Sequence, residues 1–159
     1  MNNHTVRSTV AGPAGLLACA VDTPTGASRG VAVLCHPHPQ HGGTMDNKVV
    51  LTLARAMVQL GYTSVRFNFR GVGGSEGSWD HGQGEVQDAL AVIAAHQMAD
   101  QALVLGGFSF GGYVASQAAA QLLHRVHRCR ALGSGGRGFR RGLAGHGLGG
   151  LGVGRLVRG

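Results

Sequence analysis

A serine flanked by glycines is the part of this sequence best suited to do chemistry. Residues 104–112 read VLGGFSFGG, and residues 107–111 form the pattern G-x-S-x-G. Where a strand turns sharply into a helix, glycines at these two positions let the backbone fold tightly. The Ser109 hydroxyl is then exposed beside the N–H groups that open the helix. The pattern predicts a nucleophilic serine, with an incidental turn in a chain of 29 glycines as the alternative.

The elements that position Ser109 are predicted from apolar runs and from the glycines and prolines that end them. Helices are expected at residues 49–60, capped by Thr44 or Asp46, and at residues 84–97 and 113–127; strands are expected at residues 4–10, 16–22, 30–35, 63–69 and 102–105. This alternation predicts an α/β fold with right-handed crossovers and a mostly parallel sheet that has helices on both faces. Because the carboxyl ends of parallel strands share one edge, residues 36–43, residues 70–77 and Ser109 are expected to meet there.

Three segments give the chain a resemblance to a known family. They are CHPHPQHGGTMDNK at residues 35–48, NFRGVGGSEG at residues 68–77 and GFSFGG at residues 107–112. In this order they resemble the small, lidless α/β-hydrolases akin to dienelactone hydrolase, over residues 5–128. The resemblance implies an incomplete α/β-hydrolase fold. It also implies a serine hydrolase that acts on a small-molecule acyl ester or a related carbonyl substrate.

Two backbone donors are needed to stabilise the oxygen of a tetrahedral intermediate, and losing one costs about 3 kcal/mol. In the fold that the resemblance implies, one donor is the N–H after the nucleophile, which belongs to Phe110. The other comes from the loop after the third strand, where Pro37 and Pro39 have no N–H. His38 is therefore the predicted second donor of the oxyanion hole, and Gln40 is the next candidate.

The polar residues of these loops allow two other interpretations. His36, His38 and His41 are close enough in sequence to suggest metal ligands. Their loop offers no cysteine or carboxylate to complete such a set, so we expect no metal and no cofactor. The glycine loop at residues 70–77 lacks the third glycine of a phosphate-binding G-x-G-x-x-G, because Glu76 stands there. We expect this loop to line the substrate pocket.

The residues after Ser109 do not supply the rest of a catalytic triad. In the α/β-hydrolase fold an Asp or Glu and then a His follow the serine, whereas no acid follows Asp100. His124 and His127 fall on the helix after Ser109, and His146 falls near the C-terminus. We expect impaired turnover, because an incomplete triad leaves a rate only about 10³- to 10⁴-fold above that in water. A catalytically inactive binding protein is the alternative.

The composition changes abruptly near residue 129. Residues 1–128 contain eight Lys or Arg and seven Asp or Glu, whereas residues 129–159 contain six Arg, twelve Gly and no acid. We interpret residues 1–128 as the N-terminal part of a hydrolase domain and residues 129–159 as a disordered, irregular Gly/Arg-rich tail. A G+C-rich gene read in a shifted frame yields this composition, so the family's C-terminal part is expected to be missing. No strand is expected after Val126, which would leave the strand of Val104 at an exposed edge.

Partners and location are predicted from the same composition. A Gly/Arg-rich tail can bind nucleic acid through phosphates, but this tail has one aromatic residue and no repeated Arg-Gly-Gly unit, so no such partner is expected. The sequence has no run of about 18 apolar residues and no basic start followed by an apolar block. With three widely spaced cysteines, it favours a cytoplasmic protein without a membrane partner.

Overall fold

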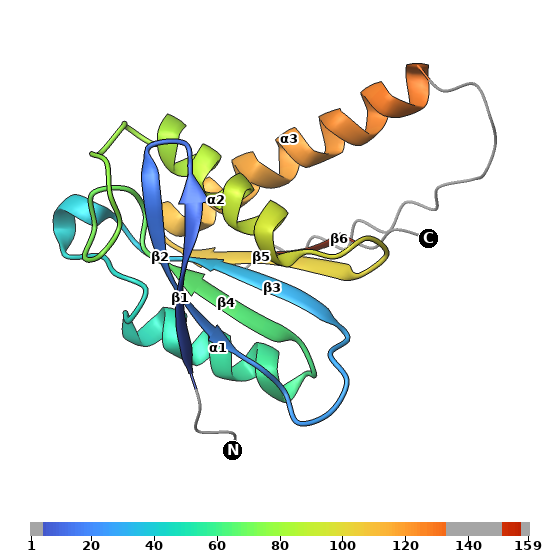
Figure 1. Ribbon diagram of the computed structural model, residues 1–159, viewed down its shortest axis with the longest axis horizontal. Helices are drawn as coiled ribbons and strands as arrows, with labels where there is room; N and C mark the ends of the chain where they lie inside the picture. The colour runs from blue at the N-terminus through green and yellow to red at the C-terminus, as the bar shows by residue number, and fades with distance from the viewer. Residues whose placement is uncertain (1–4, 133–150, 157–159) are drawn as a thin grey trace.

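The computed structural model describes residues 5–132 and 151–156 of the chain. In these residues one sheet is formed with the strand order β1-β2-β4-β3-β5-β6 (Figure 1). The strands are β1 Val6–Gly12, β2 Gly15–Asp22, β3 Gly30–Cys35, β4 Thr63–Phe67, β5 Ala102–Phe108 and β6 Leu151–Leu156. The helices are α1 Lys48–Gln59, α2 Gln83–His96 and α3 Phe110–Leu132, with a short 3₁₀ turn, η1, at Pro39–His41.

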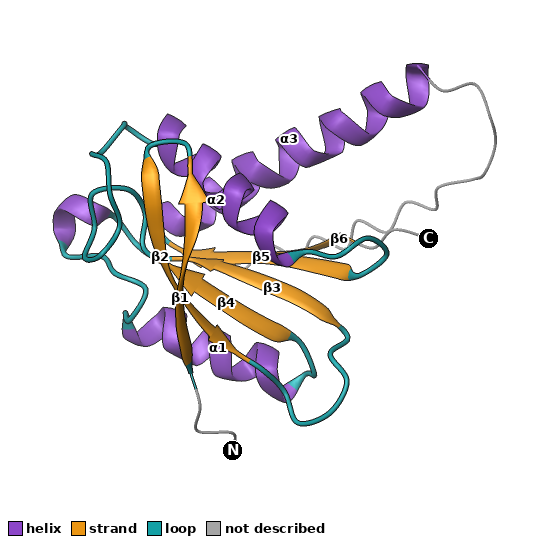
Figure 2. Ribbon diagram, viewed as in Figure 1, coloured by secondary structure: helices purple, strands orange, loops and turns teal. Residues whose placement is uncertain are grey.

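Parallel strands occupy the centre of the sheet and antiparallel pairs lie at its edges. Strand β3 pairs in parallel with both β4 and β5, whereas the β1–β2, β2–β4 and β5–β6 pairs are antiparallel. The chain crosses from β3 to β4 through α1 and returns past β3 to β5 through α2. Right-handed crossovers in opposite directions place their helices on opposite faces, and Figure 2 shows α1 on one face and α2 and α3 on the other. The predicted α/β fold with helices on both faces is confirmed. The sheet of the described strands is mixed rather than mostly parallel, because only the two pairs that β3 makes are parallel and the three outer pairs are antiparallel.

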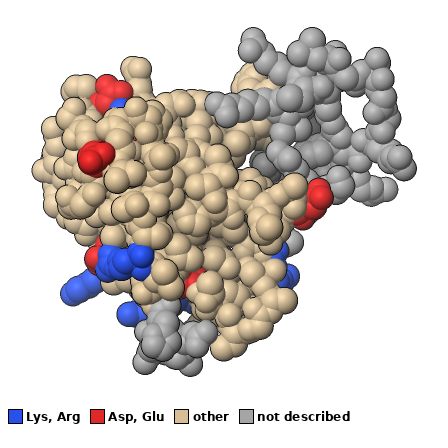
Figure 3. Space-filling model, viewed as in Figure 1, with Lys and Arg blue, Asp and Glu red and all other residues tan. Residues whose placement is uncertain are grey.

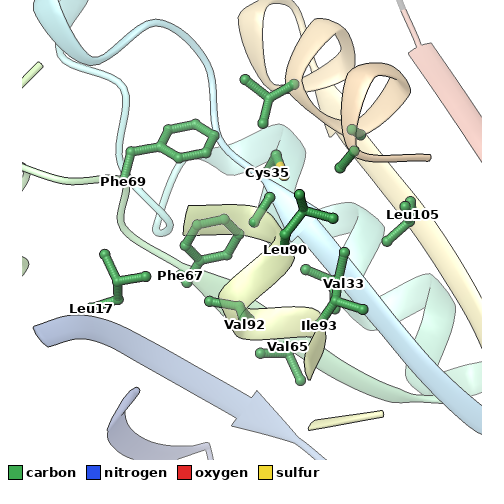
Figure 4. Close-up of a cluster of buried hydrophobic side chains, with 14 of the residues drawn as sticks. Leu17, Val33, Cys35, Val65, Phe67, Phe69, Leu90, Val92, Ile93 and Leu105 are labelled. Carbon is green, nitrogen blue, oxygen red and sulfur yellow. The ribbon is translucent and has the colours of Figure 1, made fainter. Parts of the chain in front are cut away.

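The main hydrophobic core lies between the sheet and the α2–α3 layer (Figure 4). All six residues of β3 are buried, as expected for an apolar strand with helices on both sides. The largest fully buried apolar side chains of this core are Phe67, Phe69, Leu17 and Leu103. The core thus anchors the ends of β3, β4 and β5, which hold the loops that the sequence places at one rim.

Helix α1 is capped by Asn47, one residue after Asp46 and three after Thr44. The side chain of Asn47 accepts a hydrogen bond from the N–H of Val49 (2.9 Å), so the cap expected from Thr44 or Asp46 was wrong. Asp46 is used elsewhere, because its carboxylate accepts a hydrogen bond from the buried guanidinium of Arg66 (2.9 Å). A long-range ion pair therefore overrides the local capping preference.

The glycine loop at residues 70–77 ties the N-terminal hairpin to the end of β4. Glu76 pairs with Leu16 twice, through its own N–H (2.8 Å) and through its carboxylate (2.7 Å). The hydroxyl of Ser75 accepts from the N–H of Ala18 (2.9 Å) and donates to the carbonyl of Asn68 (2.7 Å). The serine and glutamate of this segment therefore join β1–β2 to the central sheet.

The C-terminal elements differ from the expectation. Helix α3 continues to Leu132, and β6 pairs with β5 from Leu103↔Leu156 to Phe108↔Leu151. The expectation of no strand after Val126 was therefore wrong, because ladder hydrogen bonds use the main chain and need no continuous apolar run. Val104 is buried. Most of the residues expected to be disordered, 133–150 and 157–159, lie outside the described residues. The division between a hydrolase part and a tail at residue 128 stays a prediction.

The described charged side chains form no large patch on the face of the molecule that Figure 3 shows. On the face shown in Figure 3, Lys, Arg, Asp and Glu side chains are scattered among larger uncharged areas. At the surface, Arg7 and Asp46 form an exposed ion pair (3.2 Å), a kind of pair that contributes at most about 1 kcal/mol. None of the helices within residues 5–132 has both the length and the hydropathy that a membrane span requires.

Candidate active site

Ser109 lies at the bend between β5 and α3, at the carboxyl edge of the parallel strands. Its φ is +55°, which places a non-glycine residue in the left-handed region, and its side chain is exposed. The carbonyl of Ser109 accepts from the N–H groups of Gly112 (2.9 Å) and Tyr113 (3.3 Å), so the helix starts directly after the serine. Such backbone strain costs about 1–3 kcal/mol and is found mainly at functional sites. The predicted strand, tight bend and helix around Ser109 are present.

The two glycines of G-x-S-x-G are required for space. A Cβ atom on Gly107 would lie within 3.0 Å of the main chain of Gly111 and Gly112, and one on Gly111 within 3.0 Å of the carbonyl oxygens of Cys35 and His36. Neither glycine has a positive φ, so close approach is the reason for both. The end of β3 and the start of α3 are thus in direct backbone contact beside Ser109.

The two predicted oxyanion donors belong to segments that the fold brings into contact. The imidazole of His38 packs against the ring of Phe110, with centroids 5.1 Å apart. Within the described residues, no hydrogen-bond acceptor is found for the backbone N–H of His38 or of Phe110. Both groups are therefore free to bind a ligand oxygen, and their role as donors stays a prediction.

His36 fixes the loop that carries His38, a role that the sequence did not suggest. Its Nε2 accepts from the N–H of Phe69 (3.1 Å), so its Nδ1 carries the proton and donates to the carbonyl of Pro37 (2.7 Å). A trans peptide is planar, so fixing the Pro37 carbonyl also fixes the direction of the His38 N–H. The hydrogen bond between His36 and Phe69 could not be predicted from the sequence, because the two residues are 33 positions apart.

This arrangement requires a neutral imidazole. Burial lowers the pKa of His36 from its ordinary value of 6.5 to about 4, although its hydrogen bond to Pro37 acts in the opposite direction. Both ring nitrogens are used in hydrogen bonds to the main chain, which leaves neither for the metal that His36 suggested by its position. Among the described residues, no group of three His, Cys, Asp or Glu side chains is placed to hold a metal ion.

We expect His36 to make folding stability depend on pH between 6.5 and 4. Above 6.5 the imidazole is neutral in both states and its contribution is complete. As the pH falls, the unfolded chain takes up a proton that the folded chain resists, so about 3 kcal/mol is lost by pH 4. Urea unfolding at a series of pH values should show this slope reduced in His36→Gln and retained in His41→Gln, which changes an exposed imidazole. Equal slopes in wild type and His36→Gln would contradict it.

The buried cysteines are not alternative nucleophiles. Cys19 and Cys35 are free thiols, and burial raises their pKa values to about 11 and about 12. A thiol must lose its proton to attack a carbonyl, so these two groups stay unreactive near neutral pH. Ser109, by contrast, is exposed at the carboxyl edge of the parallel strands.

Comparisons with known proteins agree with this geometry. The sequence matches the family described as X-Pro dipeptidyl-peptidase (S15 family) over residues 15–137, a range that contains all three resembling segments. An uncharacterized protein of Rickettsia prowazekii is 42% identical over 109 residues, which cover 67% of this chain and 46% of that protein.

Two solved structures are similar in both sequence and fold. One is an α/β serine hydrolase without a lid from Xanthomonas campestris, with 46% identity and a TM-score of 0.70 over 77% of this chain and 59% of that one. The other is an α/β serine hydrolase homologue from Coxiella burnetii, with 45% identity and a TM-score of 0.69 over 76% and 59%. The chain therefore spans between about half and three fifths of the length of these relatives. The resemblance to lidless α/β-hydrolases is confirmed, and the chain belongs to the S15 family within the α/β-hydrolase superfamily.

Proposed function

We propose that Ser109 is the nucleophile of an acyl transfer on a small ester or a related carbonyl compound. The bond from Ser109 Oγ to the carbonyl carbon forms, the bond to the leaving alcohol breaks, and the hydroxyl proton leaves with the alcohol. Water then hydrolyses the acyl-serine. Ester hydrolysis and the peptide hydrolysis named in the family's description share this first step. The observation that carries the proposal is an exposed serine at φ +55° on a bend that only glycines permit.

The oxyanion would lie between the N–H groups of Phe110 and His38. The Phe110 N–H opens α3, where the helix dipole also favours negative charge. The His38 N–H is fixed through the Pro37 carbonyl by His36. Donors that are oriented before the reaction stabilise the developing charge without reorganisation.

We further propose that this chain turns over slowly, because the acid and the histidine that follow the serine in this fold are missing from their usual places. His124 lies fourteen residues into α3, about 20 Å along the helix from Ser109, and is exposed. The Nδ1 of His38 accepts a hydrogen bond from the N–H of Gln40 (3.3 Å), so the main chain of its own loop already uses this nitrogen. No Asp or Glu follows Ser109 in the sequence. A folded protein that binds acyl compounds without reaction is the alternative.

A fluorophosphonate probe tests the nucleophile. We expect mass spectrometry to find one label on Ser109, lost in Ser109→Ala and kept in Ser116→Ala. Ser116 is the matched control, because it is an exposed serine on the same helix. Hydrolysis of p-nitrophenyl acetate should stay about 10³- to 10⁴-fold above the uncatalysed rate. Labelling that persists in Ser109→Ala would exclude Ser109 as the nucleophile. A turnover near 10 s⁻¹, the median for enzymes, would exclude the proposed slow turnover.

A further inference from the structure

Aromatic and imidazole rings gather beside Ser109 from three separate segments. The loop after β3 contributes His38 and His41, the loop before α2 contributes Trp79 and His81, and the first turn of α3 contributes Phe110 and Tyr113; these six residues are called the rim cluster below. The ring of Trp79 lies 4.7 Å from that of His38 and 5.1 Å from that of Phe110, centroid to centroid. His38 stacks on His41 at 4.6 Å.

The rim cluster lies at the edge of the hydrophobic core, against which Phe110 packs. Tyr113 is 52% exposed, His41 and His81 are exposed, and the other three rings are half-buried. By contrast, Phe69 is fully buried, and its ring lies 5.7 Å from that of Phe110. The whole chain has only eight Phe, Tyr and Trp residues, and its only tryptophan is in this cluster. Partly exposed rings cost free energy in water and gain it when a ligand covers them.

The loop that presents Trp79 is held by one buried carboxylate. The carboxylate of Glu85, fully buried, accepts from the N–H groups of Asp80 (2.9 Å) and Gly82 (2.7 Å). His81 has φ +52°, a strained conformation for a non-glycine residue. A Cβ atom on Gly82 would lie 3.3 Å from the ring of Tyr113, so this loop packs directly on the first turn of α3. The bond from the Gly82 N–H to Glu85 is an ordinary feature of a helix start, because Gly82 is the N-cap of α2 and Glu85 is the third residue of that helix. This bond and the strain at His81 together favour a fixed position for Trp79.

We propose that the rim cluster binds a planar aromatic group of the substrate, next to the carbonyl that Ser109 attacks. The inference rests on the proposed role of Ser109 and adds the class of acyl compound. The rings of Trp79 and Phe110 meet at 52°, an arrangement that leaves ring faces and edges for offset or edge-to-face packing with a further ring. Phe110 also supplies the proposed oxyanion N–H, so a ring seated on its side chain lies within reach of the reacting carbonyl.

Binding without chemistry tests the aromatic preference directly. Trp79 is the only tryptophan, so its emission reports on the rim cluster. Benzamide and cyclohexanecarboxamide match closely in size and differ in the π system. Wild-type protein titrated with each amide should show a saturable change in emission, with affinity about fivefold higher for benzamide. A linear response to both amides, like that of free N-acetyltryptophanamide, or equal affinity for both, would overturn the inference whatever the reactivity of Ser109.

Reaction rates with two matched probes test it at the nucleophile. A fluorophosphonate with a benzyl group is compared with one carrying a cyclohexylmethyl group. The Ser109 Oγ–phosphorus bond forms, the phosphorus–fluorine bond breaks, and the proton leaves as HF. We expect the benzyl probe to label Ser109 about fivefold faster in wild type, a ratio that falls to about one in Trp79→Leu and is largely retained in Trp79→Phe. If both probes label Ser109 at the same rate, the aromatic inference fails and the proposed function stands. If Ser109 is not labelled at all, the proposed function fails and the amide titration alone decides.

Discussion

Gly111→Ala is expected to lower the free energy of unfolding by at least about 3 kcal/mol. Its Cβ atom would lie within 3.0 Å of three main-chain atoms at the end of β3, which cannot rotate away as a side chain can. Overpacking a core by a methylene typically costs about 1–3 kcal/mol, and here the cost is higher because the atoms in the way are rigid backbone. The loop that presents His38 starts at these atoms, so the rate of Ser109 labelling should fall as well.

Gly112→Ala is the matched control for this prediction. It adds the same methyl group one residue further along α3, where the added atom would lie 3.6 Å from the Gly107 carbonyl oxygen, an ordinary contact. Alanine has a higher helix propensity than glycine, so stability should stay unchanged or rise by up to about 1 kcal/mol. Urea unfolding of the two variants measures the difference. A Gly111→Ala protein as stable as Gly112→Ala would mean that β3 and α3 are not packed this closely.

Asp88→Ala is expected to lower the free energy of unfolding by about 3–5 kcal/mol. The Asp88 carboxylate is fully buried and binds the Arg70 guanidinium at 2.7 Å, besides accepting from the Arg70 N–H at 3.0 Å. The side-chain hydrogen bonds to Asp88 raise the pKa of Arg70 above its ordinary value, which shows how strongly this pair favours the charged guanidinium. Removing the carboxylate leaves a largely buried cation without its principal partner.

Asp80→Asn is the control for Asp88→Ala. Asp80 approaches the same guanidinium at 3.9 Å, but its side chain is 55% exposed. Exposed ion pairs contribute about 0–1 kcal/mol, so this change should be close to neutral. Thermal or urea unfolding of both variants, compared at one pH, provides the measurement. Equal losses of stability would indicate that burial does not decide the strength of the pairs around Arg70.

Much of the fold and the position of Ser109 could be predicted from the sequence. A six-residue apolar run predicts β3, and each of its residues is buried. The G-x-S-x-G pattern predicts a strand, a bend and a helix, and these are present with Ser109 at positive φ. Such features depend on the period of apolar residues and on where glycine and proline fall, which are local properties of the chain.

Other features depended on residues that are distant in sequence. Asp46 resembles a helix cap, but Arg66 binds it and Asn47 caps α1 instead. His36 resembles a metal ligand, but the N–H of Phe69 occupies its Nε2. The pairing of β6 with β5 was missed as well, because main-chain hydrogen bonds leave no apolar pattern in a Gly-rich segment.

The sequence by itself determined the class of fold, the bend that exposes Ser109 and the lack of an acid after it. Only the tertiary structure decided which polar side chains serve the site and which hold the fold, and it alone assembled the rim cluster from three segments. The reason is that backbone conformation follows mainly from neighbouring residues, whereas a polar or aromatic side chain takes its role from the partners that packing brings to it.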